Sequence, residues 1–421
     1  MSAFRIAIVA VILTLFSSAA APAVVTPPSE GSADLRMVIV MSRHGVRSPT
    51  HPTELQAYAR QPWPAWSGKP GNLTQHGAAL MKQLGAYYRN LYDGLLVGTG
   101  RRCPAEGSVF VWADVDERTV ASGDALLQGF APGCGIVVHH ASGDNDSLFD
   151  PLPGVGTVDK AKSMASVLGA VGGSFAGIPV AYGAPFATME EALGCTAPSS
   201  CKQISRIPTT ASNGGDGGLA SLDGGLDMAG DVAENMLLEY TNGNAEVGWG
   251  RVDHARLLQL LQLHVLGKQL EHGNRYTARA HSSNIMAHIL ETLQQGAPGA
   301  TTRGTRVPPQ TRFVFLSGHD TQLAEISGLL GLSWLIEGDQ FNDTPPGSAL
   351  TFELYAPRGG GGAYVRTYFS SQTLDAMRSG HGEKPLRVPV YVPGCPGYNC
   401  PFSTFTRIVQ GAIDPAFVTN W

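Results

Sequence analysis

The feature that most constrains the fold of this chain is a recurring pattern: a short, apolar, β-branched run, then turn residues, then a stretch with helical periodicity. Chains with this pattern form a sheet with helices on its faces. After at least three of the runs, apolar side chains recur at helical spacing, as at Leu80 and Leu84, at Leu126 and Phe130, and at Leu323 and Ile326. The sequence therefore predicts an α/β fold with a mostly parallel central sheet flanked by helices. The predicted strands are residues 37–41, 109–113, 136–139, 313–316, 349–355 and 364–368.

The middle of the chain has a different pattern. Between about residues 150 and 298 strand signals are few, whereas 231–240 and 254–272 are apolar at helical spacing. We therefore predict an inserted α-helical cap domain at 150–298, between two parts of an α/β domain at 33–149 and 299–421.

Two glycine-rich stretches lie between predicted elements. The stretch 212–225 precedes the two predicted helices of the cap, and we expect it to be a mobile loop. The stretch 359–362 separates the last two predicted strands and indicates a hairpin loop.

The first residues have the pattern of a secretory signal peptide. Arg5 precedes an apolar run at 6–16, and small residues around Ala21 offer cleavage sites. The run is shorter than the roughly 20 residues that a membrane-spanning helix needs, and we expect no later stretch to be long and apolar enough. The protein is therefore expected to be periplasmic or secreted and free of the membrane once residues 1–23 are removed.

The six cysteines fit a periplasmic or secreted protein, because disulfides persist in an oxidising compartment. Zinc binding is the alternative, but the chain has no CxxC pair and its spacings do not suit a tetrahedral site. Sequence alone permits many pairings, and two pairs are close enough in the chain to close short loops. The expected disulfides are Cys195 with Cys201, Cys395 with Cys400 and, by elimination, Cys103 with Cys134.

The formal net charge of −5 is mild. Nucleic-acid-binding proteins normally carry a basic excess or a basic stripe, so this charge argues against a nucleic-acid partner. Local clusters of positive charge are therefore interpreted as sites, and we expect a monomer that acts on a small molecule.

Such a cluster recurs where predicted strands end. Arg43, His44 and Arg47 follow the first strand, Arg118 follows the second, and His319 and Asp320 follow a late strand. Ligands of open α/β sheets bind outside the carboxyl ends of the strands, beside helix N-termini. If these strands are parallel neighbours, the side chains converge and form a trap for a phosphate dianion, which arginine binds through two parallel hydrogen bonds.

A histidine between arginines suggests chemistry as well as binding. The arginine charges lower the pKa of His44 and so favour the neutral imidazole, which is a nucleophile toward phosphorus. The leaving alkoxide then needs a proton, and Asp320 is the candidate donor. Nearby cations lower the pKa of Asp320 and bound phosphate raises it, so we expect an acidic working range.

These residues resemble those of the histidine acid phosphatases in the histidine phosphatase superfamily. The motifs are MSRHGVRSPT, LTQHG, ADVDERT, GWGR, SGHDT and DTPPGSALTFELY, and they cover nearly the whole mature chain. The resemblance implies the phosphoglycerate mutase-like fold with a helical cap, disulfides, and hydrolysis without metal or cofactor. It also assigns roles: His44 as nucleophile, Asp320 as general acid, and Arg43, Arg47, Arg118 and His319 as phosphate ligands.

The same resemblance leans toward phytase or broad acid phosphatase. Gly45, which glucose-1-phosphatases typically replace, is present, whereas His51 after the motif residue Thr50 stands where related phytases usually carry lysine. Glu234 and His281 fall near cap positions that contact substrate, and His281 again replaces an expected cation. Since histidine is charged mainly below about pH 6.5, we expect any preference for a highly anionic substrate to strengthen in acid.

Other polar residues are given structural roles. His139 and His140 are adjacent in a predicted strand and point to opposite faces, which disfavours a shared metal. Asp114 and Asp116 are interpreted as supports for the site.

Two other function classes stay open at this point, a catalytically silent phosphate-binding or polyanion-binding protein and, more weakly, a metal-dependent hydrolase.

Overall fold

The structure is a computed structural model that describes residues 33–421 except 52, 97–101, 198–200, 300–305 and 383; the expected signal peptide lies outside the described residues. Its centre is an eight-stranded sheet in the order β10-β8-β7-β1-β6-β2-β3, with β9 paired to β8. Strands β1, β6, β2 and β3 are parallel, and the later strands pair antiparallel. The strands are β1 (Ala33–Arg43), β2 (Val109–Ala113), β3 (Val138–His139), β6 (Phe313–Gly318), β7 (Ala349–Pro357), β8 (Tyr364–Ser371), β9 (Leu386–Val390) and β10 (Cys400–Pro401).

The predicted α/β class is confirmed, and the sequence of β1 shows why the strand is central. Successive side chains of a strand point to opposite faces, and here Met37 and Ile39 enter one core cluster while Val38 and Val40 enter another. A strand that is buried on both faces needs a continuous apolar run.

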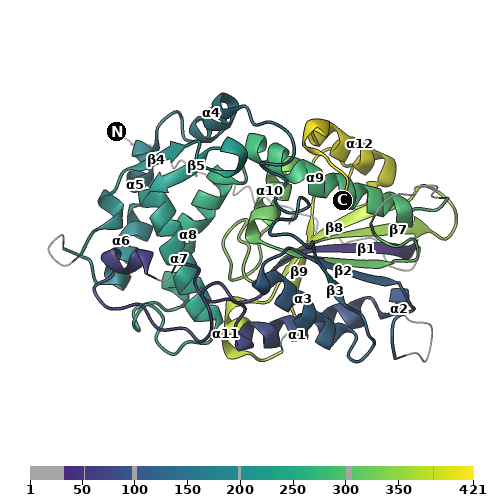
Figure 1. The fold of residues 1–421 in the computed structure, drawn as a ribbon, viewed down its shortest axis with the longest axis horizontal. Helices are drawn as coiled ribbons and strands as arrows, with labels where there is room; N and C mark the ends of the chain where they lie inside the picture. Colours follow the sequence, from purple (N-terminus) through teal and green to yellow (C-terminus); the bar gives the residue numbers. More distant parts are fainter. Residues whose placement is uncertain (1–32, 52, 97–101, 198–200, 300–305, 383) are drawn as a thin grey trace, which may run out of the picture. The chain divides into compact units, whose positions relative to one another are not determined.

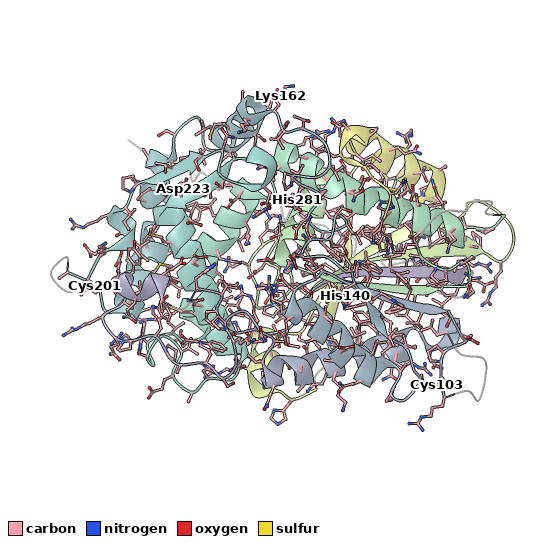
Figure 2. The ribbon with its side chains drawn as sticks, in the orientation of Figure 1. Cys103, His140, Lys162, Cys201, Asp223 and His281 are labelled. Carbon is pink, nitrogen blue, oxygen red and sulfur yellow. A yellow bond between two sulfur atoms is a disulfide. The ribbon has the colours of Figure 1, made fainter. Side chains whose placement is uncertain are left out.

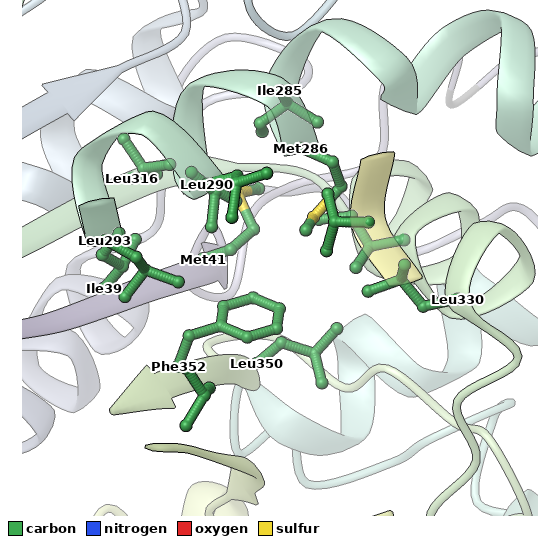
Figure 3. Close-up of a cluster of buried hydrophobic side chains, with 14 of the residues drawn as sticks. Ile39, Met41, Ile285, Met286, Leu290, Leu293, Leu316, Leu330, Leu350 and Phe352 are labelled. Atoms are coloured by element: carbon green, nitrogen blue, oxygen red, sulfur yellow. The ribbon is translucent and has the colours of Figure 1, made fainter. Parts of the chain in front are cut away.

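Helices cover both faces of the sheet (Figure 1). On one face α1 and α3 pack against each other and against β1 and β6. On the other face lies α9, whose Ile285 and Leu290 pack over Met41 of β1 and Phe352 of β7 (Figure 3). The helices of the two faces are α1 (Gln75–Leu91), α3 (Glu117–Phe130), α9 (Arg275–Gly296), α10 (Asp320–Leu330) and α12 (Phe402–Ala412), and short helices α2 (Asp93–Leu96) and α11 (Leu374–Ser379) follow α1 and β8.

The segment between β3 and α9 builds a helical part with its own apolar core. Its helices are α4 (Lys160–Ala170), α5 (Ile178–Ala181), α6 (Gly183–Leu193), α7 (Gly225–Thr241) and α8 (His254–Glu271). The leucines of α8 at 257, 260, 261 and 263 are buried against α6 and α7, as the sequence suggested. The domain limits stay a prediction, and α9, within the predicted cap limits, packs on the sheet.

The glycine-rich stretch 212–225 is only partly a loop. Strand β5 (Ser221–Gly224) pairs antiparallel with β4 (Thr209–Ser212), and Leu222 between the glycines is buried. The expectation of a mobile loop is therefore wrong for this end of the stretch, because one buried leucine and a strand partner outweigh the glycine content. Short 3-10 helices span Glu54–Tyr58, Phe175–Gly177, Ile204–Arg206, Asp216–Gly218 and Pro415–Phe417.

One later stretch is, contrary to expectation, long and apolar enough to cross a membrane. Lys160–Ala181 has 22 residues, and an 18-residue window within it has a mean hydropathy of 1.6. In the structure it is not one helix, because α4 ends at Ala170 and Gly172 and Gly173 take positive φ before α5 begins. Val167, Phe175 and Ile178 of this stretch pack into the core of the helical part.

All six cysteines form disulfides in the expected pairs, which excludes the alternative of a cysteine zinc site. Two bridges close short loops, with sequence separations of 6 and 5 residues. The third joins Cys103, labelled in Figure 2, to Cys134 across 31 residues that include α3.

Candidate active site

The sheet brings the three predicted junctions together at one edge. Arg43 at the end of β1 lies opposite Gly318 at the end of β6, and β2 pairs with the other side of β6. The main chain continues this pairing beyond the strands, because His44 N–H donates to the Gly318 carbonyl at 2.8 Å. On the other side, Asp114 N–H donates to the Ser317 carbonyl at 3.0 Å. The expectation of parallel neighbours is confirmed.

His44 is buried and held in one tautomer. Its Nδ1 lies 2.8 Å from the carbonyl oxygen of Gly45. A carbonyl only accepts, so Nδ1 carries the proton and Nε2 keeps its lone pair. Burial lowers the pKa of His44 well below its usual value, and the charges of Arg43, His319, Arg47 and Arg118 lower it further. This direction agrees with the neutral imidazole predicted from the sequence.

Helix α1 supports the loop that carries His44. Gly77 lies so close to this loop that a Cβ at this position would meet the Val46 carbonyl oxygen at 2.2 Å. Thr74 caps the helix by accepting from Gly77 N–H, and its own hydroxyl donates to the same Val46 carbonyl. The LTQHG motif is thus a contact surface for the loop.

Glu234 joins two of the arginines. Arg43 is buried and donates to the Thr344 carbonyl at 2.7 Å and to Glu234 Oε1. Arg47 Nη2 lies 3.3 Å from the same carboxylate oxygen. Burial alone raises the pKa of Glu234, but the charges of Arg43, His264 and Arg47 hold it below its usual value. The carboxylate therefore offsets part of the positive charge of the two arginines.

Two aspartates hold Arg118 and His319, which are predicted to bind phosphate. Asp114 is buried, and its Oδ2 accepts from His319 Nε2 at 2.8 Å. Asp116 Oδ2 lies 2.5 Å from Arg118 Nη2, which is itself 3.5 Å from His319 Nδ1. The supporting role predicted for the two aspartates fits these contacts.

Asp320 begins α10 and faces cations on one oxygen only. Its Oδ1 accepts from Thr321 N–H at 3.0 Å. Its Oδ2 lies 3.4 Å from Lys268 Nζ, 3.8 Å from His264 Nε2 and 3.9 Å from Arg43 Nη2. Burial alone raises the pKa of Asp320, but these charges bring it well below its usual value. This direction agrees with the effect of nearby cations predicted from the sequence.

Sequence reasoning missed His264 and Lys268 of α8. They are spaced i, i+4 on a helix that was interpreted only through its leucines, and this spacing places them on one face. The signal was available as two polar residues among apolar ones, but the sequence could not show that this face of the insert turns toward Asp320.

The other residues predicted to contact substrate lie in different parts of the structure. Thr50 and His51 are exposed beside the loop of Arg47. His281 of α9 lies between the helical part and the sheet (Figure 2), and its Nδ1 is 3.0 Å from Glu325 Oε2. Although burial lowers the pKa of His281, Glu325, Asp150 and Asp216 raise it to about 9. The expectation that this histidine is charged only in acid is therefore wrong.

Three groups of carboxylates and histidines within the described ranges have ligand atoms within 4.8 Å of one another. In each group the carboxylates already form ion pairs with an arginine, a lysine or a protonated histidine. The carboxylate oxygens therefore suit side-chain cations, which they bind through hydrogen bonds, better than a metal ion. The groups are Asp114, Asp116 and His319; Asp150, Asp216 and His281; and Glu234, His264 and Asp320.

Comparison with known proteins identifies the family. The model of the histidine phosphatase superfamily (branch 2) matches residues 34–175 and 251–370. These ranges include the predicted site residues at the strand ends, namely Arg43, His44, Arg47, Arg118, His319 and Asp320, but not Glu234. The chain belongs to this superfamily. A phytase of Escherichia coli (strain K12) is 34% identical over 413 residues, covering 92% of this chain and 94% of the relative. A glucose-1-phosphatase of Providencia rettgeri is 24% identical over 428 residues, covering 96% and 99%.

Solved structures of this superfamily agree with the fold. The phytase of Hafnia alvei in complex with myo-inositol hexakis sulphate has a TM-score of 0.84 and 31% identity, covering 93% of this chain and 100% of that one. The histidine phosphatase fold predicted from the motifs is therefore confirmed.

Proposed function

We propose that the protein is an exported histidine acid phosphatase, which hydrolyses phosphomonoesters through a phosphohistidine at His44, with inositol phosphates among its substrates. One observation carries this proposal: Nε2 of a neutral, buried His44 has a free lone pair among three arginines, with Asp320 close by. The phosphate ligands are Arg43, Arg47, Arg118 and His319.

In the first step His44 Nε2 attacks phosphorus, and the P–O bond to the leaving group breaks. The arginines stabilise the charge on the equatorial oxygens. Asp320 delivers a proton to the leaving oxygen, so that an alcohol departs and a phosphohistidine remains. In the second step Asp320 takes a proton from water, which attacks phosphorus and releases phosphate and His44.

The proton supply favours an acidic medium. The charges of Lys268, Arg43 and His264 lower the pKa of Asp320 and so favour its ionised form. Bound phosphate neutralises part of this positive charge and raises the pKa of Asp320, so the proportion of protonated donor grows as the pH falls.

The substrate class rests on the relatives. The proteins named phytases that share about a third of this sequence support inositol phosphates as substrates, and the presence of Gly45 is in keeping with this. Thr50, His51, Glu234 and His281 are the proposed contacts to the remainder of the substrate. Three disulfides and the leader-like start of the sequence support export.

Replacement of His44 with alanine tests the mechanism. We expect turnover of p-nitrophenyl phosphate to disappear while phosphate still binds, and an alkaline quench of the wild type during turnover of a radiolabelled substrate to trap label on His44. A wild type without activity on any phosphomonoester supports the phosphate-binding alternative. Loss of activity in EDTA supports a metal-dependent hydrolase and contradicts the proposal.

A further inference from the structure

Three buried polar atoms face one another beside the proposed proton donor. His264 Nε2 lies 3.6 Å from Glu234 Oε2 and 3.8 Å from Asp320 Oδ2. Glu234, His264 and Asp320 are 7%, 5% and 8% exposed. They come from α7, α8 and α10, so the helical part and the sheet both contribute to the group. We call these three residues the buried trio.

The main chain holds His264 in one tautomer. Its Nδ1 lies 3.3 Å from the carbonyl oxygen of Gly230. A carbonyl only accepts, so Nδ1 carries the proton, and Nε2 of the neutral ring keeps its lone pair. The two oxygens near Nε2 belong to carboxylates, which also only accept when they are ionised. Three acceptors therefore meet at one buried place.

This meeting point lacks donors within the described ranges of the chain. Arg43 and Arg47 donate to Glu234 Oε1, but Glu234 Oε2 and His264 Nε2 have no hydrogen-bond partner. Buried acceptors that face one another without a donor are costly. A proton on any of the three atoms turns their repulsion into a charge-assisted contact. The buried trio therefore calls for one proton.

The two carboxylates are poor places for that proton. Burial raises the pKa of Asp320 and of Glu234, but nearby cations bring both below their usual values. The histidine remains. Burial lowers the pKa of His264, which the two carboxylates oppose and Lys268 and Arg43 reinforce. Because the net effect is a lowering, His264 takes up its proton in acid, in line with the proposed acidic working range.

An aspartate whose pKa is so low seldom carries a proton of its own. We propose that His264 Nε2 holds the proton that Asp320 delivers to the leaving group, while Glu234 Oε2 keeps the imidazolium in place. His264 acts through Asp320 and is therefore a positioning residue for the proton. This inference rests on the proposed phosphatase function and adds a step to the same reaction.

The proton is conserved through the cycle. In the first step it moves from His264 Nε2 to Asp320 Oδ2 and on to the leaving oxygen, as the P–O bond breaks. The charge of the bound phosphate raises the pKa of Asp320 and so draws the proton forward. In the second step Asp320 takes a proton from the attacking water and returns it to His264. The 3.8 Å between the two atoms shortens in the transfer, as distances between catalytic groups commonly do with substrate bound.

Two substrates that differ in their need for a proton test the inference. 2,4-Dinitrophenolate leaves without a proton, whereas the alkoxide of glucose 6-phosphate needs one. At pH 5 we expect His264→Gln to lower kcat/KM about 10- to 100-fold for glucose 6-phosphate and less than about 3-fold for 2,4-dinitrophenyl phosphate. Glutamine can still donate a hydrogen bond to the two carboxylates, so the variant keeps the contact and loses only the transferable proton.

His288→Gln is the matched control. His288 is also buried, but it contacts Glu291 and the carbonyl oxygen of Thr419, which belong to no part of the site. The same substitution there leaves the ratio of the two kcat/KM values unchanged.

The direction of a pH shift separates this role from a purely electrostatic one. The upper limb of kcat/KM for glucose 6-phosphate reports where the buried trio loses its shared proton. In His264→Gln the carboxyl of Asp320 must bind the proton alone, so the limb moves to lower pH. If His264 acts only as a positive charge, its removal raises the pKa of Asp320 and moves the limb to higher pH.

Equal losses for the two substrates overturn the inference, as does an upper limb that stays in place or moves to higher pH. A wild type that hydrolyses no phosphomonoester overturns the proposed function instead. NMR of the wild type labelled with 15N-histidine then decides where the proton lies, and it also decides if His264→Gln does not fold. A proton gained at His264 Nε2 as the pH falls from 7 to 4 supports the inference, and an Nε2 that stays unprotonated overturns it.

Discussion

Lys268 Nζ lies 3.4 Å from the Oδ2 atom of Asp320, closer than either other cation that faces this oxygen. Lys268 belongs to α8 of the helical part, whereas Asp320 begins α10 on the sheet. The cation nearest to the proposed proton donor thus comes from the helical part and not from the sheet.

Replacement of Lys268 with methionine tests the effect of this cation on the donor. Without the ammonium the pKa of Asp320 rises, so the donor stays protonated to higher pH and the upper limb of the kcat profile moves to higher pH. The shift is expected for glucose 6-phosphate, whose alkoxide needs a proton, and is smaller for p-nitrophenyl phosphate. Lys268→Arg keeps the charge and serves as the control. An upper limb that coincides with that of the wild type contradicts the role of Lys268.

The contact between Asp114 and His319 makes a second prediction. Asp114→Ala leaves His319 Nε2 without its acceptor, and a hydrogen bond to a charged group contributes about 1.5 to 3 kcal/mol. If the contact acts in the transition state, kcat/KM falls roughly 10- to 100-fold. The double variant with His319→Ala is expected to lose no more than His319→Ala alone. Additive losses show that Asp114 does not act through His319.

Glu239 on α7 predicts a pH-dependent stability. It is buried, and burial raises its pKa to about 7 from the usual 4.5, although Gly248 N–H donates to it. Between these pH values the folded protein binds more protons than the unfolded chain, so stability falls as the pH rises. Glu239→Gln removes this penalty and is expected to raise the free energy of unfolding at pH 8 by up to about 3 kcal/mol. Urea unfolding at pH 4.5 is the control, since no gain is expected there.

The Cys103–Cys134 bridge closes the longest disulfide loop, with a sequence separation of 31 residues. Replacing both cysteines with serine is expected to lower the free energy of unfolding by about 3 to 4 kcal/mol, because the unfolded chain gains freedom with loop length. The pair Cys395 and Cys400, separated by 5 residues, gives a matched comparison with an expected loss of about 2 kcal/mol. Equal losses contradict the loop-length explanation.

The sheet and the polar residues at its carboxyl edge could be predicted because each sequence pattern that indicates them lies within a short stretch of the chain. An apolar run that is buried on both faces indicates a central strand, and a polar motif directly after it must lie at the carboxyl edge. Arg43, Arg118 and His319 could therefore be placed together from sequence alone, as could the effect of their charges on His44.

The contacts from the insert were not predictable in the same way. Whether Glu234 contacts substrate or holds two arginines depends on how α7 faces β1, which no local pattern specifies. The charge of His281 likewise depends on Glu325 and Asp150, which lie 44 and more than 100 positions away in the chain. The usual pKa of a histidine side chain predicted the wrong titration range for His281, because the neighbouring carboxylates raise its pKa.

The register that sets Arg43 opposite Gly318 also has a consequence for biosynthesis. The proposed nucleophile, His44, is made early and the proposed proton donor, Asp320, is made 276 positions later, and they meet only when β1 pairs with β6. A growing chain therefore contains His44 long before it contains a reaction centre. Hydrolytic activity arises only after synthesis has passed α10, so the phosphate esters of the cell that makes the chain are spared until then.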